Sequence, residues 1–110
     1  MPISEIEPRV LAARLAGPEA QRPLLIDVRS AEENAHVALP GSRLWPLPEL
    51  EEHVKEFAEL GERDVVVYCH HGVRSQHGAA FLQQHGVQAS SLAGGIERYA
   101  VEVDTTMRRY

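Results

Sequence analysis

Hydrophobic residues occur along this chain in short unbroken runs that alternate with stripes of helical period. The clearest runs span Leu24–Ile26 and Val65–Tyr68. Each is too short for a buried helix and is typical of a buried β-strand. We also predict three further short strands, at Ile3–Ile6, Arg43–Trp45 and Val87–Leu92, so we expect about five.

The segments between these runs predict helices. Ser30 and Glu33 form a capping-box pattern, which predicts a short helix over Ala31–His36. Helical spacing of apolar residues predicts a helix that starts near Pro8 and ends at Gly17-Pro18, and three others at Leu47–Leu60, Ser75–His85 and Ile96–Val103. Strands that alternate with helices at this spacing predict an α/β fold, with a mainly parallel sheet and helices on both faces. The length of 110 residues predicts one domain over residues 1–110.

Composition narrows the functional classes. A net charge of −5 and the lack of a basic patch argue against a nucleic-acid partner. No apolar run approaches the length of a membrane span, and the start of the chain lacks the features of a signal peptide. One cysteine excludes an internal disulfide and fits a reducing compartment, so we expect a cytoplasmic protein without a membrane partner.

That cysteine, Cys69, stands where the strand over Val65–Tyr68 gives way to a polar loop and then a helix. Ligands of open α/β sheets bind at the carboxyl ends of strands, and the unpaired N–H groups at a helix start attract anions. A thiol among such groups is expected to ionise easily, and the thiolate is its reactive form. The alternative is a small core residue. The polar loop and Gly72, which suits a backbone with positive φ, favour the reactive thiol.

The histidines that follow the cysteine raise the question of a metal site. Adjacent side chains such as His70 and His71 rarely converge on one ion, and no spaced partner motif accompanies them. We therefore expect no metal and no other cofactor, and predict that this pair lies at the rim of the loop, where it attracts an anionic donor when protonated. We expect the other four histidines to lie on the surface: His36, His53, His77 and His85.

Four short motifs, in order and at compatible spacing, resemble those of single-domain rhodaneses, which are sulfurtransferases. They are Asp27-Val28-Arg29 at a strand end, the turn Leu39-Pro40-Gly41-Ser42, the loop Cys69-His70-His71-Gly72-Val73-Arg74-Ser75, and Gly94-Gly95 before a last helix. The resemblance covers about Leu24 to Tyr99. The chain departs from the family at Val37-Ala38-Leu39, where Gly-His-Ile is common, and at Tyr99, where Trp is common.

The resemblance implies that a persulfide forms on Cys69. The main-chain N–H groups of His70, His71, Gly72, Val73, Arg74 and Ser75 would surround its outer sulfur. The charge of Arg74 would act in catalysis, or would hold the loop through an ion pair with Asp27 or Glu32. Asp27 and Arg29 are expected to support the site rather than react.

The resemblance leaves donor and acceptor open. A small donor such as thiosulfate is expected, with cyanide, a small thiol or a sulfur-carrier protein as acceptor. The segment Val101–Tyr110 resembles the end of rhodanese units fused to adenylyltransferases of cofactor biosynthesis, which favours a sulfur-carrier pathway.

Two other functions compete with sulfur transfer. Cysteine-loop phosphatases and arsenate reductases also use a thiolate and an arginine, but they need five residues between the two, and here there are four. A non-catalytic rhodanese-like binding module is the other alternative, and the intact loop argues against it.

Overall fold

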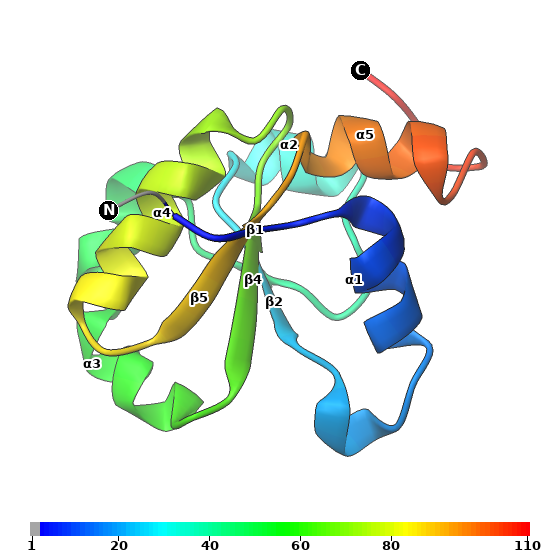
Figure 1. Ribbon diagram of the computed structural model, residues 1–110. Helices are drawn as coiled ribbons and strands as arrows, with labels where there is room; N and C mark the ends of the chain where they lie inside the picture. The colour runs from blue at the N-terminus through cyan, green and yellow to red at the C-terminus, as the bar shows by residue number, and fades with distance from the viewer. Residues whose placement is uncertain (1–2) are drawn as a thin grey trace.

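The computed structural model describes residues 3–110 and contains one five-stranded sheet. The strands are β1 (Glu5–Ile6), β2 (Leu24–Asp27), β3 (Arg43–Leu44), β4 (Asp64–Tyr68) and β5 (Gln88–Leu92). Their order is β1-β5-β4-β2-β3, and every neighbouring pair is parallel. Figure 1 shows β4 at the centre of the sheet. The predicted α/β fold is confirmed, and the sheet is entirely rather than mainly parallel.

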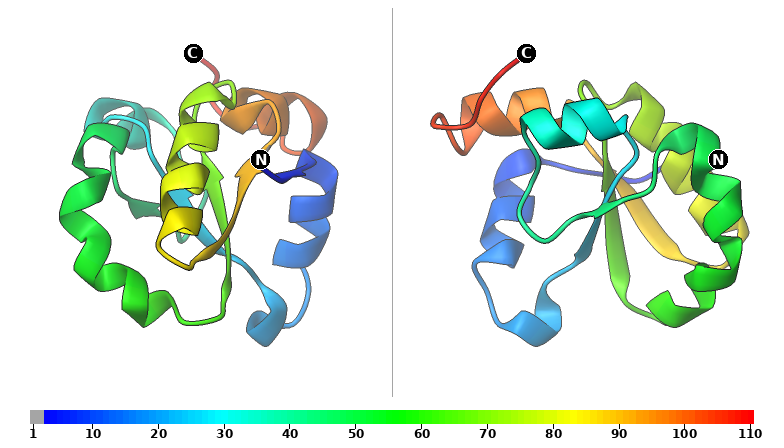
Figure 2. Two further views of the ribbon diagram at one scale, coloured as in Figure 1. Left: turned by 60° about the vertical axis from the view of Figure 1, so that its left-hand side comes forward. Right: turned by 180° about the vertical axis from the view of Figure 1, so that it is seen from behind.

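The helices cover both faces of the sheet, as predicted (Figure 2). They are α1 (Pro8–Leu15), α2 (Ala31–His36), α3 (Val54–Phe57), α4 (Val73–Gln84) and α5 (Gly95–Glu102). Short 3₁₀ helices span Glu19–Gln21 (η1), Leu47–His53 (η2) and Ala58–Leu60 (η3). The bounds of α2 match its prediction, and the capping box of Ser30 and Glu33 is present. The helix α1 starts at the predicted Pro8 and ends two residues before Gly17.

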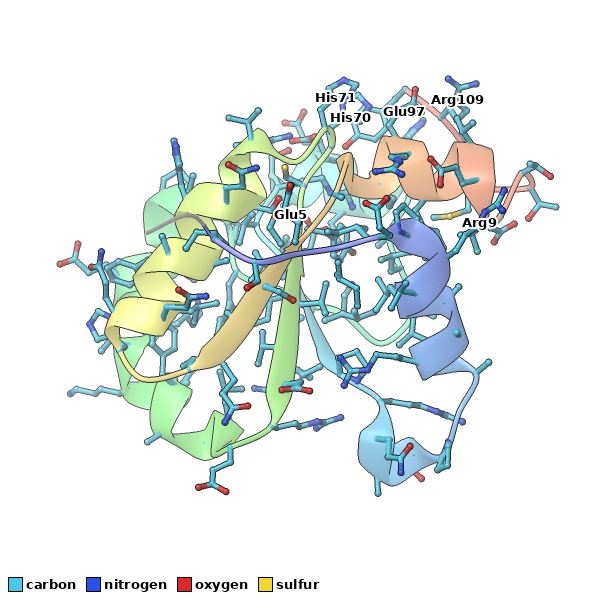
Figure 3. The ribbon with its side chains drawn as sticks, viewed as in Figure 1. Glu5, Arg9, His70, His71, Glu97 and Arg109 are labelled. Atoms are coloured by element: carbon cyan, nitrogen blue, oxygen red, sulfur yellow. The ribbon has the colours of Figure 1, made fainter. Side chains whose placement is uncertain are left out.

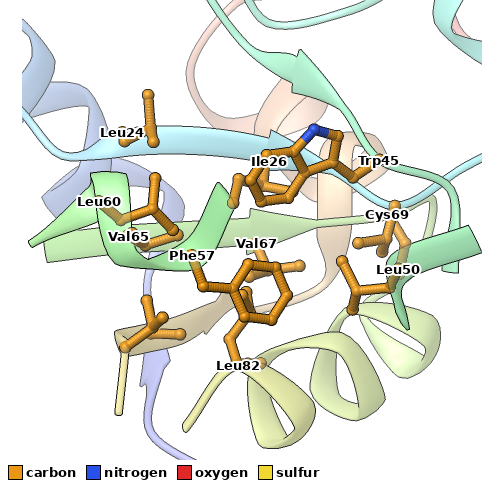
Figure 4. Packing of buried hydrophobic residues seen from close by; sticks show 14 residues of the cluster. Leu24, Ile26, Trp45, Leu50, Phe57, Leu60, Val65, Val67, Cys69 and Leu82 are labelled. Atoms are coloured by element: carbon orange, nitrogen blue, oxygen red, sulfur yellow. The ribbon is translucent and has the colours of Figure 1, made fainter. Parts of the chain in front are cut away.

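Alternate side chains of the two central strands enter two separate cores, as the two-residue period of a strand requires. Val65 and Val67 pack under α3 and α4, whereas Val66 and Tyr68 pack against α1 and α5. Cys69 continues the first series and lies at one end of that core (Figure 4). The strand therefore brings its sulfur to the α4 side of the sheet.

The prediction of a single amphipathic helix over Leu47–Leu60 is wrong. Residues 47–60 form η2, α3 and η3, with only four residues in α-helical conformation. The side chains that pack on the core explain the difference, because Leu47, Leu50, Val54, Phe57 and Leu60 follow one another mostly at intervals of three. That spacing keeps them on one face of a helix with three residues per turn.

No helix in residues 3–110 is long and apolar enough to cross a membrane.

Candidate active site

Cys69 directly follows β4, at the edge of the sheet where all five parallel strands have their carboxyl ends. Cys69 is 1% exposed and contacts the apolar core under α4. The expected position at a strand end is therefore correct. The sulfur lies in a buried site whose outer wall is the loop that follows.

Two main-chain N–H groups of this loop point at the sulfur. The Gly72 N–H donates to Sγ at 3.0 Å and the Ser75 N–H donates at 3.3 Å. Gly72 has φ of 102° and caps α4, so its backbone takes the left-handed conformation that the sequence predicted. The helix consequently starts at Val73, two residues earlier than predicted, and Ser75 belongs to its first turn, where N–H groups lack a helical partner.

The carbonyl groups of the loop point away from the sulfur, towards α5. Ile96 N donates to the Cys69 carbonyl at 2.8 Å, and Glu97 N donates to the His70 carbonyl at 3.1 Å. Gly95 allows this close approach, because a Cβ atom there would lie 2.2 Å from the His70 oxygen. The start of α5 thus holds these two carbonyls away from the sulfur, at which the Gly72 and Ser75 N–H groups point.

A chain of hydroxyl groups continues from the sulfur into the protein. The Cys69 thiol donates to Ser75 Oγ at 3.3 Å, and Ser75 Oγ lies 2.7 Å from Ser91 Oγ of β5. Both serines are fully buried. Sequence reasoning missed Ser91. Its only signal was its place in a predicted short strand.

Arg74 forms an ion pair, but with a different carboxylate from those predicted. Its guanidinium donates to both oxygens of Glu33, at 2.8 and 2.9 Å, rather than to Asp27 or Glu32. The cause is geometric, because the capping box already directs the Glu33 carboxylate back to the start of α2. The hydrogen bond from Arg74 holds the pKa of Glu33 well below its ordinary value, and the same bond raises the pKa of Arg74.

Asp27 and Arg29 form a fully buried ion pair behind the loop. Arg29 donates to the two carboxylate oxygens of Asp27 at 2.8 Å each, and to the carbonyl of Val37 at 2.6 Å. Asn34 adds a bond to Asp27 at 2.9 Å. Burial alone would lower the pKa of Arg29, but its bonds to Asp27 and Tyr110 raise the pKa above the ordinary value. The pair fastens α2 and residue 37 to the end of β2.

The histidines differ in environment more than the sequence suggested. His71 is exposed, whereas His70 is half-buried, with its ring 4.0 Å from that of His71 (Figure 3). Burial and the neighbouring His71 lower the pKa of His70, so His70 resists the protonation expected of it. Within residues 3–110, no three His, Cys, Asp or Glu side chains gather as a metal site would require.

The other histidines separate into two groups. His77 and His85 of the α4 region are exposed, as predicted. The prediction for His36 and His53 is wrong, since both are half-buried. His53 stacks on Trp45, with ring centres 4.8 Å apart, and His36 meets the edge of Tyr110.

Tyr110, which sequence reasoning did not single out, reaches the site from the segment that follows α5. Its ring stacks on His70, with centres 3.9 Å apart and planes 10° from parallel. Its hydroxyl accepts from Arg29 Nη1 and donates to Glu33 Oε2, both at 2.7 Å. No local pattern marked this residue, because its partners are 40 to 81 positions away in sequence.

The rhodanese-like domain family matches residues 7–102, most of the chain. The chain belongs to the rhodanese-like domain family. The match includes Asp27, the Cys69 loop and the Gly94-Gly95 turn, and it confirms the resemblance inferred from the four motifs.

Curated relatives of this rhodanese-like chain are about one-third identical to it. It is 33% identical over 99 residues to a protein of Allochromatium vinosum named sulfurtransferase, covering 89% of each chain. It is 31% identical to the rhodanese-like/PpiC domain-containing protein 12, chloroplastic, of Arabidopsis thaliana, of which it spans only 38%. The crystal structure of a rhodanese-like domain protein from Staphylococcus aureus matches with a TM-score of 0.81 at 23% identity, covering 98% of this chain and 99% of that one. This last likeness shows the fold.

The two departures from family motifs meet on the α1 and α5 side of the rhodanese-like fold. Val37-Ala38-Leu39 and Tyr99 line one cleft of about 620 Å³. The described residues that line it include none of the Cys69 loop. The departures therefore alter a surface away from the sulfur.

Proposed function

We propose that this protein is a sulfurtransferase that carries sulfur as a persulfide on Cys69. The observation that carries the proposal is the pair of N–H groups, from Gly72 and Ser75, that donate to Sγ at the start of α4. Hydrogen bonds from N–H groups stabilise an anionic sulfur. The similarity to a relative named sulfurtransferase supports the same reaction.

Loading the enzyme from thiosulfate would form one bond and break one. The Cys69 thiolate attacks the outer sulfur of thiosulfate, the S–S bond of the donor breaks, and its electron pair leaves with sulfite. In the second step an acceptor such as cyanide or a thiolate attacks the outer sulfur of the persulfide, and the Cys69 thiolate leaves. No net oxidation occurs, so one cysteine is sufficient.

The loop supplies main-chain N–H groups for the outer sulfur. The N–H groups of His70, His71, Gly72, Val73, Arg74 and Ser75 lie between the strand end and the first turn of α4. The carbonyls of Cys69 and His70 are held by α5, and the N–H groups of Gly72 and Ser75 already point at the sulfur that would carry the persulfide. Arg74, 40% exposed, adds a positive charge for an anionic donor.

A phosphatase would need room for a tetrahedral anion. Four residues separate Cys69 from Arg74, and the side chain of Arg74 is turned to Glu33. Both observations favour a single sulfur atom as the guest. Turnover of an aryl phosphate that exceeds turnover of thiosulfate with cyanide would favour the phosphatase instead.

The direct test is the intact mass of the protein after incubation with thiosulfate. We expect a gain of one sulfur atom that a reductant removes, and no gain in Cys69→Ala. The circular dichroism of that variant should match the wild type, since the loop bonds to α5 use main-chain atoms. A wild-type protein that gains no sulfur from thiosulfate or from a small persulfide would refute sulfur transfer, and would favour a binding module.

A further inference from the structure

The segment 103–110 turns back along α5 and ends above the Cys69 loop. Val103 N and Asp104 N donate to the Tyr99 carbonyl at 2.9 and 3.1 Å, and Met107 packs on the core under α5. Arg109 then donates to both oxygens of Glu97, at 2.8 Å each. Figure 3 shows Arg109 and Glu97 beside His70 and His71 at the same edge of the molecule. The segment is thus attached at several points before it reaches the loop.

Tyr110 contacts one end of that loop directly and reaches the other end through Glu33. At the first end its ring lies flat on His70, the neighbour of Cys69. At the other end its hydroxyl donates to Glu33, the carboxylate that holds Arg74. The same hydroxyl accepts a bond from the buried Arg29.

We propose that Tyr110 is a positioning residue for sulfur transfer, which fixes the Cys69 loop by joining His70 to the Glu33–Arg74 pair. The proposal rests on the proposed function, because the loop is what would hold the persulfide. Tyr110 would act through these neighbours and touch neither donor nor sulfur. It places Glu33, and the Glu33 carboxylate in turn holds the guanidinium of Arg74 in one orientation.

The hydroxyl of Tyr110 has a specific task between two charges. Arg29 offers an N–H and Glu33 offers an oxygen, and a hydroxyl is the group that accepts one bond while donating another. Burial first, and then its bond to Glu33, raises the pKa of Tyr110 to about 12, so the hydroxyl keeps its proton. Phenylalanine would keep the ring on His70 but leave Arg29 Nη1 and Glu33 Oε2 each without this partner.

The ring has a separate task at His70. Its stacking covers the imidazole, whose Nε2 is buried without a hydrogen-bond partner among residues 3–110. The titratable and charged groups that face His70 are His71 from the loop, Glu97 from α5 and Glu33 from α2. Burial and His71 lower the pKa of His70, and this lowering outweighs the opposite effect of the two carboxylates and of the Tyr110 main chain. If the ring is removed, His70 should take up a proton more readily in mild acid. The protonated His70 would then attract an anionic donor.

The experiment measures the rate of persulfide formation from thiosulfate by rapid quench and intact mass at pH 6 and pH 8. The variants are Tyr110→Phe, which removes the hydroxyl, and Tyr110→Leu, which removes hydroxyl and ring. Arg108→Gln, an exposed residue of the same segment, is the control. We expect both Tyr110 variants to load about tenfold more slowly at pH 8, the effect of losing a hydrogen bond to a charged group.

Only Tyr110→Leu should change the pH profile. Its ratio of the pH 6 rate to the pH 8 rate, divided by the wild-type ratio, should rise roughly threefold, because a new positive charge would face a dianion in water. Tyr110→Phe and Arg108→Gln should keep the wild-type ratio. A purely structural role would slow both Tyr110 variants equally at the two pH values.

The outcomes separate this proposal from the proposed function. If the wild type loads and Tyr110→Phe loads within twofold of it, the positioning role is overturned while sulfur transfer stands. If the pH ratio of Tyr110→Leu equals that of the wild type, the role of the ring is overturned. If the wild type itself fails to load, the proposed function fails first.

Discussion

The opposite charges of Asp27 and Arg29 are buried together, and neither reaches solvent. Burial of either charge alone is costly, and a pair repays that cost only when its remaining hydrogen-bonding groups are also satisfied. Here Asn34, the Val37 carbonyl and the Tyr110 hydroxyl complete the network. We therefore propose that the pair holds the site in place.

Asp27→Asn should be much more destabilising than the same change at the surface. It would leave the guanidinium of Arg29 buried without a counter-charge, and the free energy of unfolding should fall by about 3–5 kcal/mol. Asp64→Asn is the matched control. Asp64 pairs with Arg14 at 2.9 Å in an exposed position, where such a pair contributes about 0–1 kcal/mol. Urea unfolding of both variants makes the comparison, and equal losses would contradict the role of the buried pair.

Individual site residues were predictable where the signal was local in sequence. Cys69 and Gly72 were identified because strand, thiol, glycine and helix follow one another within a few positions. The partner of Arg74 was mistaken because Glu32 and Glu33 are adjacent, and only the direction of the capping side chain decides between them. Ser91 and Tyr110 were missed because the fold brings them to the loop from distant segments.

At the scale of elements, the site depends on the contact between the loop and the start of α5. Gly95→Ala should break it, because the new Cβ would lie 2.2 Å from the His70 oxygen and 2.6 Å from the Cys69 oxygen. Both atoms are backbone and cannot move without losing the bonds from Ile96 and Glu97. We expect loss of persulfide loading and a lower free energy of unfolding.

Gly86→Ala is the control for this substitution. Gly86 also has positive φ, 83° against 66° at Gly95, but a Cβ there would meet nothing within 4 Å. It should cost only the backbone strain, of about 1–2 kcal/mol, and should leave loading unchanged. If Gly95→Ala loads sulfur as fast as Gly86→Ala, the α5 contact is not needed for the loop.

The elements themselves differed in how well the sequence predicted them. Four signals predicted element bounds within one residue. They are the apolar runs of β2 and β4, the capping box of α2, and the proline that marks the start of α1. Residues 47–60 were mistaken for one α-helix because spacings of three and four are hard to separate over so few turns. η1 carried no apolar pattern, as all three of its residues are exposed.

At the scale of the whole molecule, the order of the strands in the sheet could not be predicted from the sequence. Alternation of strands and helices predicts a parallel sheet, but not that β4 lies between β5 and β2. That central position makes the end of β4 a deep site, with α4, α5 and α2 around it. The burial of Cys69 thus follows from the order of the strands, whereas its selection as a candidate site residue follows from the local sequence motif.

The pH dependence of stability should also reflect this enclosed site. The pKa of His70 is lowered in the fold from an ordinary value of 6.5, mainly by burial. Below that value the unfolded chain takes up a proton that the folded state resists, so the free energy of unfolding should fall with pH. The pKa of Glu33 is also lowered, mainly by Arg74, from 4.5. The stabilisation that ionised Glu33 gives the folded state is therefore complete above that pH and is lost as the pH falls further.

Both effects have the same sign but occupy different pH windows, and variants can separate them. Urea unfolding should show wild-type stability declining first below about pH 6.5. His70→Asn should decline less in that upper window, and Glu33→Gln should decline less below about pH 4.5. His77→Asn, which changes an exposed histidine, should follow the wild-type curve. Parallel curves for His70→Asn and the wild type between pH 7.5 and 5.5 would mean that His70 is solvated in the native protein, and that the segment ending at Tyr110 does not cover the loop in solution.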